Sequence, residues 1–244
     1  MLLRNGHLRN LLFIDIETVP LYHSFTQLSE LEKELWTAKI NTLRAHENET
    51  PETGYNRAGI YAEFGRVICI SIGYFKYNRE ENTDTFRIKS FSGDDEKMLL
   101  QEFSALLQRS FNDSDHYQFC GHNIKEFDVP YLSRRLLING IALPNMLDVS
   151  GRKPWEMNSI DTMQLWRFGD YKSFTSLKLL AHVLGIPSPK QDISGSDVCR
   201  VFYEENDLPR IAEYCQHDVV TVARLMLKFR NEKNTLEEED VVVV

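Results

Sequence analysis

The feature that most constrains the fold is a short apolar run near the N-terminus that ends in acidic residues. Residues 11–17 read LLFIDIE, so the run is apolar on both faces before Asp15 and Glu17 are reached. Such a run is typical of a central strand that is covered by helices on both sides. Asp15 and Glu17 are two residues apart and therefore project from the same face of the strand. The run predicts the core strand of an α/β domain, with two carboxylates where the strand meets a cleft.

The chain after this run alternates between strand and helix patterns. Residues 66–77 and 83–91 are β-rich and predict antiparallel neighbours of the first strand, and residues 116–120 predict a further short strand. The expected helices cover 94–110, the segment from about 128 with Pro130 in its first turn, 175–184, 196–205 and 207–230. This order predicts an α/β fold with a central mixed β-sheet flanked by α-helices, in a single domain at residues 1–230.

Two segments fall outside this pattern. Residues 21–64 predict an insertion between the first two strands, with a helix over 27–48 followed by a loop rich in Pro and Gly. The apolar stripe expected on that helix consists of Leu28, Leu31, Leu35 and Leu43. Residues 231–244 predict an acidic, frayed C-terminal tail, whose four final valines are strand-like and could pair with another chain.

Composition narrows the class of protein without identifying its ligand. No run of about 18 apolar residues occurs and the N-terminal run is too short for a signal peptide, so we expect a cytoplasmic protein that does not enter a membrane. The four cysteines show no CxxC spacing and predict reduced, packed thiols. The net charge of −8 does not argue against a nucleic-acid ligand, because much of it lies in the tail and bound divalent cations would offset the rest.

A further acid lies on the long helix expected near the C-terminus. The apolar stripe of this helix consists of Ile211, Cys215, Val222, Leu225 and Phe229. Asp218 lies within the stripe, and Tyr214 is one turn before it on the same face. An acid on a core-facing stripe requires a partner, and a metal ion shared with Asp15 and Glu17 would supply one.

Asp128 begins the helix that follows the turn at 121–123. Taken alone, it would be read as a helix N-cap with an effect of about 1 kcal/mol. Taken with the other clusters, it makes a fourth carboxylate of the oxygen-donor kind that Mg²⁺ and Mn²⁺ prefer. The sequence therefore predicts a metal site built from segments far apart in the chain.

These clusters carry a resemblance to a known group of enzymes. Three motifs, in this order, resemble those of the DEDD 3′–5′ exonuclease superfamily: Asp15-x-Glu17, Asn123-x₃-Phe127-Asp128 and Tyr214-x₃-Asp218. The last spacing is similar to that of the tyrosine subgroup, because the histidine subgroup would need histidine where Glu213 stands. The nearest resemblance, over about residues 12–229, is to free-standing relatives of the proofreading exonuclease domain of family-B DNA polymerases. It implies an RNase H-like fold.

The resemblance also implies a mechanism with two divalent cations, Mg²⁺ or Mn²⁺. Asp15 would bridge both ions, Glu17 and Asp218 would complete the site that holds the attacking water, and Asp128 would help to hold the second ion. Two such ions can stabilise both the entering and the leaving oxygen. Tyr214 would orient or deprotonate the water, and orientation is favoured because a free tyrosine is a poor base at neutral pH.

Other residues are weaker candidates. Asn123 and Phe127 match family positions near the terminal nucleotides, Asn123 for hydrogen bonding and Phe127 for packing or stacking, although a core-packing role is equally open for Phe127. His217 is expected to be structural or solvated, and the role of His122 stays open. Asp161 is expected to open a strand, either as a supporting acid or with a local hydrogen bond. The basic residues considered for phosphate contact, none assigned individually, are Lys125, Arg134, Arg135, Lys172 and Lys190.

The sequence thus predicts a metal-dependent 3′–5′ exonuclease that releases nucleoside monophosphates from single-stranded or frayed DNA 3′ ends, with any proofreading carried out in trans. The nearest alternative is a 3′–5′ exoribonuclease. Two further readings stay open: a catalytically inactive nucleic-acid-binding module of the same fold, and a phosphatase that uses Asp15 as a covalent nucleophile.

Overall fold

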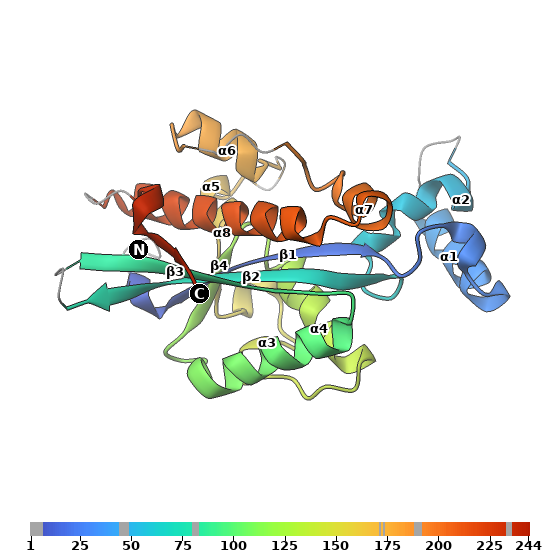
Figure 1. Cartoon of the computed structure of the whole chain (residues 1–244), viewed down its shortest axis with the longest axis horizontal. Helices are drawn as coiled ribbons and strands as arrows, with labels where there is room; N and C mark the ends of the chain where they lie inside the picture. Colours follow the sequence, from blue (N-terminus) through green and yellow to red (C-terminus); the bar gives the residue numbers. More distant parts are fainter. Residues whose placement is uncertain are drawn as a thin grey trace.

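A mixed sheet of six strands, in the order β5-β4-β1-β2-β3-β6, forms the centre of the computed structural model (Figure 1). The structure describes residues 7–43, 49–79, 83–170, 172, 174–187, 192–232 and 236–244. The strands are β1 (Leu11–Pro20), β2 (Gly65–Asn78), β3 (Thr83–Ser92), β4 (Gln118–Gly121), β5 (Ser159–Asp161) and β6 (Val241–Val243). The α-helices are α1 (Glu30–Thr42), α2 (Pro51–Gly54), α3 (Glu96–Ser110), α4 (Asp128–Ile138), α5 (Thr162–Arg167), α6 (Leu177–Val183), α7 (Val198–Arg200) and α8 (Leu208–Arg230).

The strand directions explain where the sheet can carry a site. β1 pairs antiparallel with β2 and parallel with β4, and β5 runs parallel with β4. The carboxyl ends of β1, β4 and β5 therefore point the same way. The α/β class with a central mixed sheet is confirmed, and the arrangement is that of an RNase H-like fold. One pairing differs from expectation: β3 pairs with β2 instead of β1, whose second neighbour is β4.

Helices cover both faces of the sheet, which is why β1 is apolar on both sides. Leu11 and Phe13 pack in a core cluster with residues of α8, including Val219 and Val222. The alternate residue Ile14 packs with α3 and α4 in a second cluster on the other face. Figure 1 shows α8 along one face of the sheet and α3 and α4 along the other.

Most helix boundaries follow from capping residues that the sequence supplies. The side chain of Asp95 accepts a hydrogen bond from the Met98 amide at the start of α3, and Asp207 caps α8 in the same way. The segment expected to be one helix over 196–205 is divided into α7 and a π-helix at Val201–Glu205. The expected helices at 94–110, 175–184 and 207–230 are confirmed within two residues at each end.

A buried ion pair joins α3 and α4, which cover the same face of the sheet, to each other and to the sheet. The Arg135 guanidinium of α4 donates to the Glu96 carboxylate of α3, at 2.9 Å from Nε and 2.5 Å from Nη2. The same carboxylate accepts the backbone amide of Val67 in β2, and Arg135 also donates to the Ala62 carbonyl. Arg135 is 5% exposed. A phosphate contact at this residue, considered from the sequence, is therefore wrong, because the guanidinium is already enclosed and paired.

The insertion forms a separate small core, and its helix presents a different face from the one expected. Trp36 and Ile40 of α1 are buried with Tyr55 and Ala58, whereas Leu31 and Leu35 are exposed. The stripe predicted from the leucine spacing is therefore wrong at these two positions, whereas Leu28 and Leu43 do pack in this cluster. Tyr55 and Ala58 lie in a 3-10 helix at Tyr55–Ile60, inside the segment expected to be a loop. Because Tyr55 packs on Trp36, the helix face that carries Trp36 is buried, and the face that carries Leu31 and Leu35 is not.

The C-terminal segment is ordered against the sheet. Val241–Val243 form β6, which pairs parallel with β3 from Phe86 to Ile88, and Leu236 is buried in the α8 face of the core. The expectation of a frayed tail is therefore wrong for these residues, because the valines find a strand edge in their own chain. Among the helices in the described residues, none is both long and apolar enough to cross a membrane.

Candidate active site

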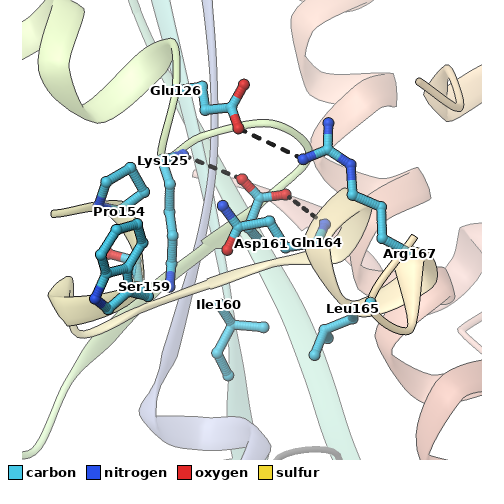
Figure 2. A pocket seen from close by; sticks show the side chains of 11 residues that line it. Lys125, Glu126, Pro154, Ser159, Ile160, Asp161, Gln164, Leu165 and Arg167 are labelled. Carbon is cyan, nitrogen blue, oxygen red and sulfur yellow. Dashed lines mark hydrogen bonds and ion pairs between the residues drawn. The ribbon is translucent and has the colours of Figure 1, made fainter. Parts of the chain in front are cut away.

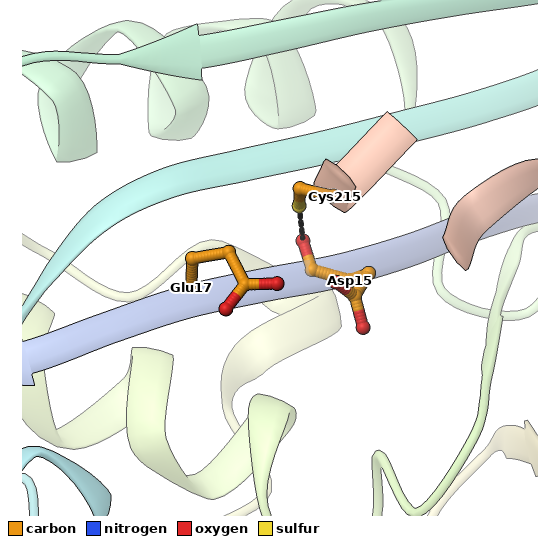
Figure 3. Close-up of side chains that lie close together, drawn as sticks. All are labelled: Asp15, Glu17 and Cys215. Atoms are coloured by element: carbon orange, nitrogen blue, oxygen red, sulfur yellow. Dashed lines mark hydrogen bonds between the residues drawn. The ribbon is translucent and has the colours of Figure 1, made fainter. Parts of the chain in front are cut away.

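Two carboxylates of β1 form the base of the candidate site. Asp15 and Glu17 project from the same face of the strand, and Figure 3 shows the Glu17 side chain reaching along β1 toward Asp15. Glu17 is 8% exposed and Asp15 is half-buried. β1 pairs with β4 only from Leu11 to Phe13, so the strand extends past its parallel neighbour before Asp15 is reached. The pairing with β2 shifts register directly after Glu17.

The helix α8 brings the second part of the site across this face. Tyr214 is half-buried, and Asp218 is one turn further along the helix and partly exposed. The Cys215 thiol between them donates a hydrogen bond to the Asp15 backbone carbonyl at 3.4 Å, which joins α8 to β1 (Figure 3). The positions predicted for Tyr214 and Asp218 thus face the acids of β1.

Asp128 arrives from the first turn of α4. It is 4% exposed, and α4 has no side-chain capping bond at its N-terminus, so the alternative of an N-cap at this position is wrong. Its carboxylate accepts backbone hydrogen bonds from its own amide and from Ile16. The bond to Ile16 places the carboxylate next to β1, between the positions of Asp15 and Glu17.

The acids influence one another strongly. Burial raises the pKa of Asp15 well above its ordinary value, and the nearby charges of Glu17, Asp218 and Asp128 raise it further. The pKa of Glu17 is raised in the same way, first by burial and then by Asp218. Burial raises the pKa of Asp128 to about 7, against an ordinary value of 3.8. Carboxylates packed in this manner favour either protonation or a bound cation.

The donor set fits a hard divalent cation. In the part of the chain that the structure describes, one ligand atom from each of Asp15, Glu17 and Cys215 lies within 4.8 Å of the others. Burial raises the pKa of the Cys215 thiol, so it carries its proton at neutral pH and does not offer a thiolate to a soft metal. The oxygens of Asp15, Glu17, Asp128 and Asp218 are the kind of donor that Mg²⁺ and Mn²⁺ prefer.

Tyr214 is set up to act with its proton in place. Burial raises the pKa of its hydroxyl above the ordinary value of 10, and the charges of Asp218, Glu17 and Asp15 raise it further. Gly195 lies close to this hydroxyl, because a Cβ placed on it would be 4.0 Å from the Tyr214 oxygen. A hydroxyl that keeps its proton is better suited to hydrogen bonding than to acting as a base.

Asn123 and Phe127 lie in the segment that connects β4 to α4. Asn123 has a left-handed backbone, with φ of 66°, and its amide donates to the Asp161 carboxylate at 3.0 Å. The side-chain Oδ1 of Asn123 is buried and has no hydrogen-bond partner among the described residues. The Phe127 ring packs against the core at 5.3 Å from the Tyr131 ring. The packing role left open for Phe127 is therefore present, and its contact with a nucleotide stays a prediction.

The remaining candidates have structural partners. The two ring nitrogens of His122 bond to the Thr162 hydroxyl at 2.9 Å and to the Thr175 carbonyl at 2.8 Å, so its role is to hold these segments together. His217 lies 4.0 Å from Glu213 on the same helix and lines a surface pocket with Tyr214. Lys190 lies outside the described residues.

Asp161 has a clear role that the sequence only partly indicated. It ends β5 and caps α5 instead of opening a strand, so that expectation is wrong. Its carboxylate accepts the amides of Asn123, Lys125, Met163 and Gln164. Asp161 thus holds the segment that leads to Asp128. The hydrogen bonds from Asn123 and Lys125 could not be predicted, because they depend on β5 lying beside β4.

Cys215 and Cys69 are the site neighbours that sequence reasoning missed. Cys69 faces Glu17 in the register of β1 and β2, and Cys215 contacts both strands from α8. The only signal in the sequence is the position of Cys215 directly after Tyr214, where its apolar spacing indicates packing.

Comparison with known proteins supplies a family description. A family model for predicted 3′–5′ exonucleases related to the exonuclease domain of PolB matches residues 60–243. The matched segment contains Asn123, Phe127, Asp128, Tyr214 and Asp218, whereas the acids of β1 precede it. The comparison with curated proteins found no significant match.

Proposed function

The chain belongs to the family of predicted 3′–5′ exonucleases related to the exonuclease domain of PolB, and on that premise we propose that it releases nucleoside monophosphates from single-stranded or frayed DNA 3′ ends. The observation that carries the proposal is the convergence of four carboxylates and one tyrosine from β1, α4 and α8. These residues are Asp15, Glu17, Asp128, Tyr214 and Asp218. The choice of DNA follows from the relation of the family to a DNA polymerase domain.

The four carboxylates would hold two divalent cations, Mg²⁺ or Mn²⁺. When bound, such ions stabilise the entering and leaving oxygens of an in-line displacement at phosphorus. The chain would contribute the placement, because Asp15 lies near enough to Glu17, Asp128 and Asp218 for the charges of all three to raise its pKa. Without cations, the mutual repulsion of these groups opposes their ionisation.

Tyr214 would act on the attacking water. Its raised pKa keeps the hydroxyl protonated, so it can donate or accept a hydrogen bond and fix the direction of the water. In this hydrolysis the water oxygen would form a bond to phosphorus as the bond from phosphorus to the 3′ oxygen of the preceding nucleotide breaks, and the proton lost by the water would end on that leaving oxygen as a 3′ hydroxyl. This role is the one that the resemblance to the tyrosine subgroup implies for Tyr214.

A direct test uses a single-stranded DNA labelled at its 5′ end and an RNA of the same sequence. Each is incubated with the protein in Mg²⁺ or Mn²⁺, and Asp15→Ala is compared with Glu102→Ala, an exposed acid of α3. A ladder that shortens from the 3′ end with wild type and Glu102→Ala, and is absent with Asp15→Ala, supports the proposal.

The outcomes separate the alternatives. Faster cleavage of RNA than of DNA would favour the exoribonuclease. No ladder on either polymer in either metal would favour a nucleic-acid-binding module of the same fold. That second candidate is the weaker one, because the full set of acids and Tyr214 is retained in a buried cluster that is costly without a cation.

A further inference from the structure

A pocket of about 390 Å³ lies beside the carboxylate cluster and includes none of its acids. Its walls come from the segment that leads to α4, from residues 154–155, and from β5 and α5. In the view of Figure 2, the Lys125 side chain runs between Pro154 on one side and Asp161 and Arg167 on the other. The volume is within the range of about 300–1,000 Å³ that is usual for sites that hold small molecules.

One aromatic side chain that the fold does not bury lines this pocket, and a second is next to lining residues in the sequence. Trp155 lines the pocket and is 73% exposed, and the Lys153 ammonium lies 5.2 Å from the centre of its ring. Phe168, which lies between the lining residues Arg167 and Gly169, is 81% exposed. Phe168 also has a left-handed backbone, with φ of 44°, which is uncommon for an aromatic residue. Exposed aromatic rings beside cations are typical of surfaces that stack unpaired bases.

The acidic groups of the pocket already have partners, whereas its cationic groups can still bind an anion. The Asp161 carboxylate is occupied by the four backbone amides described above, and Glu126 is paired with Arg167 at 3.5 Å. Arg167 Nε is buried without a hydrogen-bond partner in the described parts of the chain. Lys125 is half-buried and forms no ion pair with a carboxylate of the described residues. A phosphate group would supply the anion that both cations can bind.

One segment of the chain connects the pocket to the candidate active site. Lys125 lies two residues after Asn123 and three before Asp128, in one segment. Asp161 holds the amides of both Asn123 and Lys125, so the position of the pocket wall and the approach to Asp128 are set by the same carboxylate. A strand that enters the carboxylate cluster past Asn123 would therefore have its next nucleotide near Lys125.

We propose that this pocket binds one unpaired nucleotide of the substrate strand, with its base stacked on Trp155 and its phosphate beside Lys125 and Arg167. The inference rests on the proposed function, because it places a nucleotide of the same strand that is cleaved. It gives a structural basis for the proposed use of single-stranded or frayed ends, since a base in a duplex is already stacked on its neighbours.

Tryptophan fluorescence offers a test that does not depend on cleavage. The chain has three tryptophans, of which Trp36 is fully buried and Trp166 stacks on Phe229. In EDTA, titration with oligo(dT) should quench the emission of wild type, and a blunt duplex should not. Trp155→Leu should lose the quenching and raise the Kd for a labelled oligonucleotide about ten-fold. Trp155→Phe should restore most of the affinity, and Trp166→Phe should keep the quenching.

A charge variant tests the phosphate contact. Lys125→Met should weaken binding and lower the slope of log Kd against log salt by about 0.7, the value for one phosphate contact on a single strand. Lys97→Met, an exposed lysine of α3, should leave both unchanged. The inference is overturned if Trp155→Leu binds the oligonucleotide as wild type does, or if Trp166→Phe abolishes the quenching.

The two proposals fail in different ways. If cleavage requires Asp15 but Trp155→Leu neither weakens binding nor slows cleavage, only the pocket assignment is wrong. If oligonucleotide binding depends on Trp155 but no polymer is cleaved, the pocket assignment stands and the nuclease activity is wrong.

Discussion

Asp128 shows how burial changes a carboxyl group at this site. Loss of water around the carboxyl group raises its pKa to about 7. Hydrogen bonds from two backbone amides lower this pKa, but their effect is smaller than that of burial. In the unfolded chain the group ionises near its ordinary value of 3.8. Between these two values the folded protein therefore holds a proton that the unfolded chain releases.

The stability of the metal-free protein should consequently fall as pH rises from about 4 to about 7. A raised pKa in the folded state favours folding below the unfolded value and loses this effect as pH rises through the folded value. In EDTA, Asp128 alone should lower the free energy of unfolding by urea by about 2 kcal/mol between pH 5 and pH 7.5, and the raised pKa values of Asp15 and Glu17 act in the same direction. Asp128→Asn should reduce this difference, and a pH dependence unchanged by that variant would contradict the assignment.

A variant of Tyr214 should separate cleavage from metal binding, because its hydroxyl lies near the acids but is not a metal ligand in the proposed scheme. Tyr214→Phe should lower the rate of cleavage about 10²- to 10³-fold while the increase in melting temperature caused by Mg²⁺ is kept. Asp15→Asn should lose both cleavage and the increase in melting temperature caused by Mg²⁺. Full activity in Tyr214→Phe, with none in Asp15→Asn, would instead support the phosphatase-like reading in which Asp15 is a covalent nucleophile.

At the scale of elements, Gly121 determines how closely β4 can approach the strand that carries the acids. A Cβ at this position would lie 2.1 Å from Ile124 Cγ2 and 2.8 Å from the backbone oxygen of Ile14. The Ile14 oxygen belongs to the residue before Asp15, so the backbone that would have to move is part of the site. No side chain can be accommodated there without displacing it.

Gly121→Ala should therefore lower the free energy of unfolding by about 1–3 kcal/mol and reduce cleavage. Gly93→Ala is a matched control, because the nearest atom to its added Cβ would be 4.0 Å away. Urea unfolding and the oligonucleotide assay on both variants test this prediction. Equal stability of the two variants would show that β4 can shift away from β1 at no cost.

Much of the element order could be predicted from local signals. The apolar run before Asp15 predicted a doubly covered strand, and the helix predicted over 207–230 matches α8 to within one residue. The positions of the acids followed from strand and helix periodicity. What could not be predicted depends on partners far along the chain: Trp36 is buried because Tyr55 packs on it, and the valines of β6 pair because β3 has a free edge.

The site shows the same division between local and distant information. Tyr214 and Asp218 share one helix face, which spacing reveals. Asp161 and Cys215 act through contacts with Asn123 and Asp15, and only the fold brings these residues together. A residue whose role lies in a backbone contact of another segment leaves no pattern of its own in the sequence.

At the scale of the whole molecule, the pair of Glu96 and Arg135 joins α3, α4 and β2 in one buried network. Removing one member of a buried ion pair leaves the other charge without compensation, which costs about 3–5 kcal/mol. Arg135→Ala should lose stability in this range, as measured by urea unfolding. Arg134→Ala, at the exposed neighbouring position, should change it by less than about 0.5 kcal/mol.

A double variant distinguishes loss of the charge from loss of packing. Replacing both groups, as in Glu96→Leu with Arg135→Leu, should restore part of the stability because no unpaired charge is left in the core. If the double variant is as unstable as the sum of the single ones, the network contributes through its hydrogen bonds to Val67 and Ala62 instead.

The hydrogen bond between Cys215 and Asp15 joins residues that are 200 positions apart. Contacts this distant in sequence form late, because the intervening chain must first be ordered. A chain emerging from the ribosome can therefore complete β1, α3 and α4 while its carboxylates remain apart, and the site closes only when α8 docks. During refolding, cleavage should return after the helical signal does, so the activity itself reports the final step of folding.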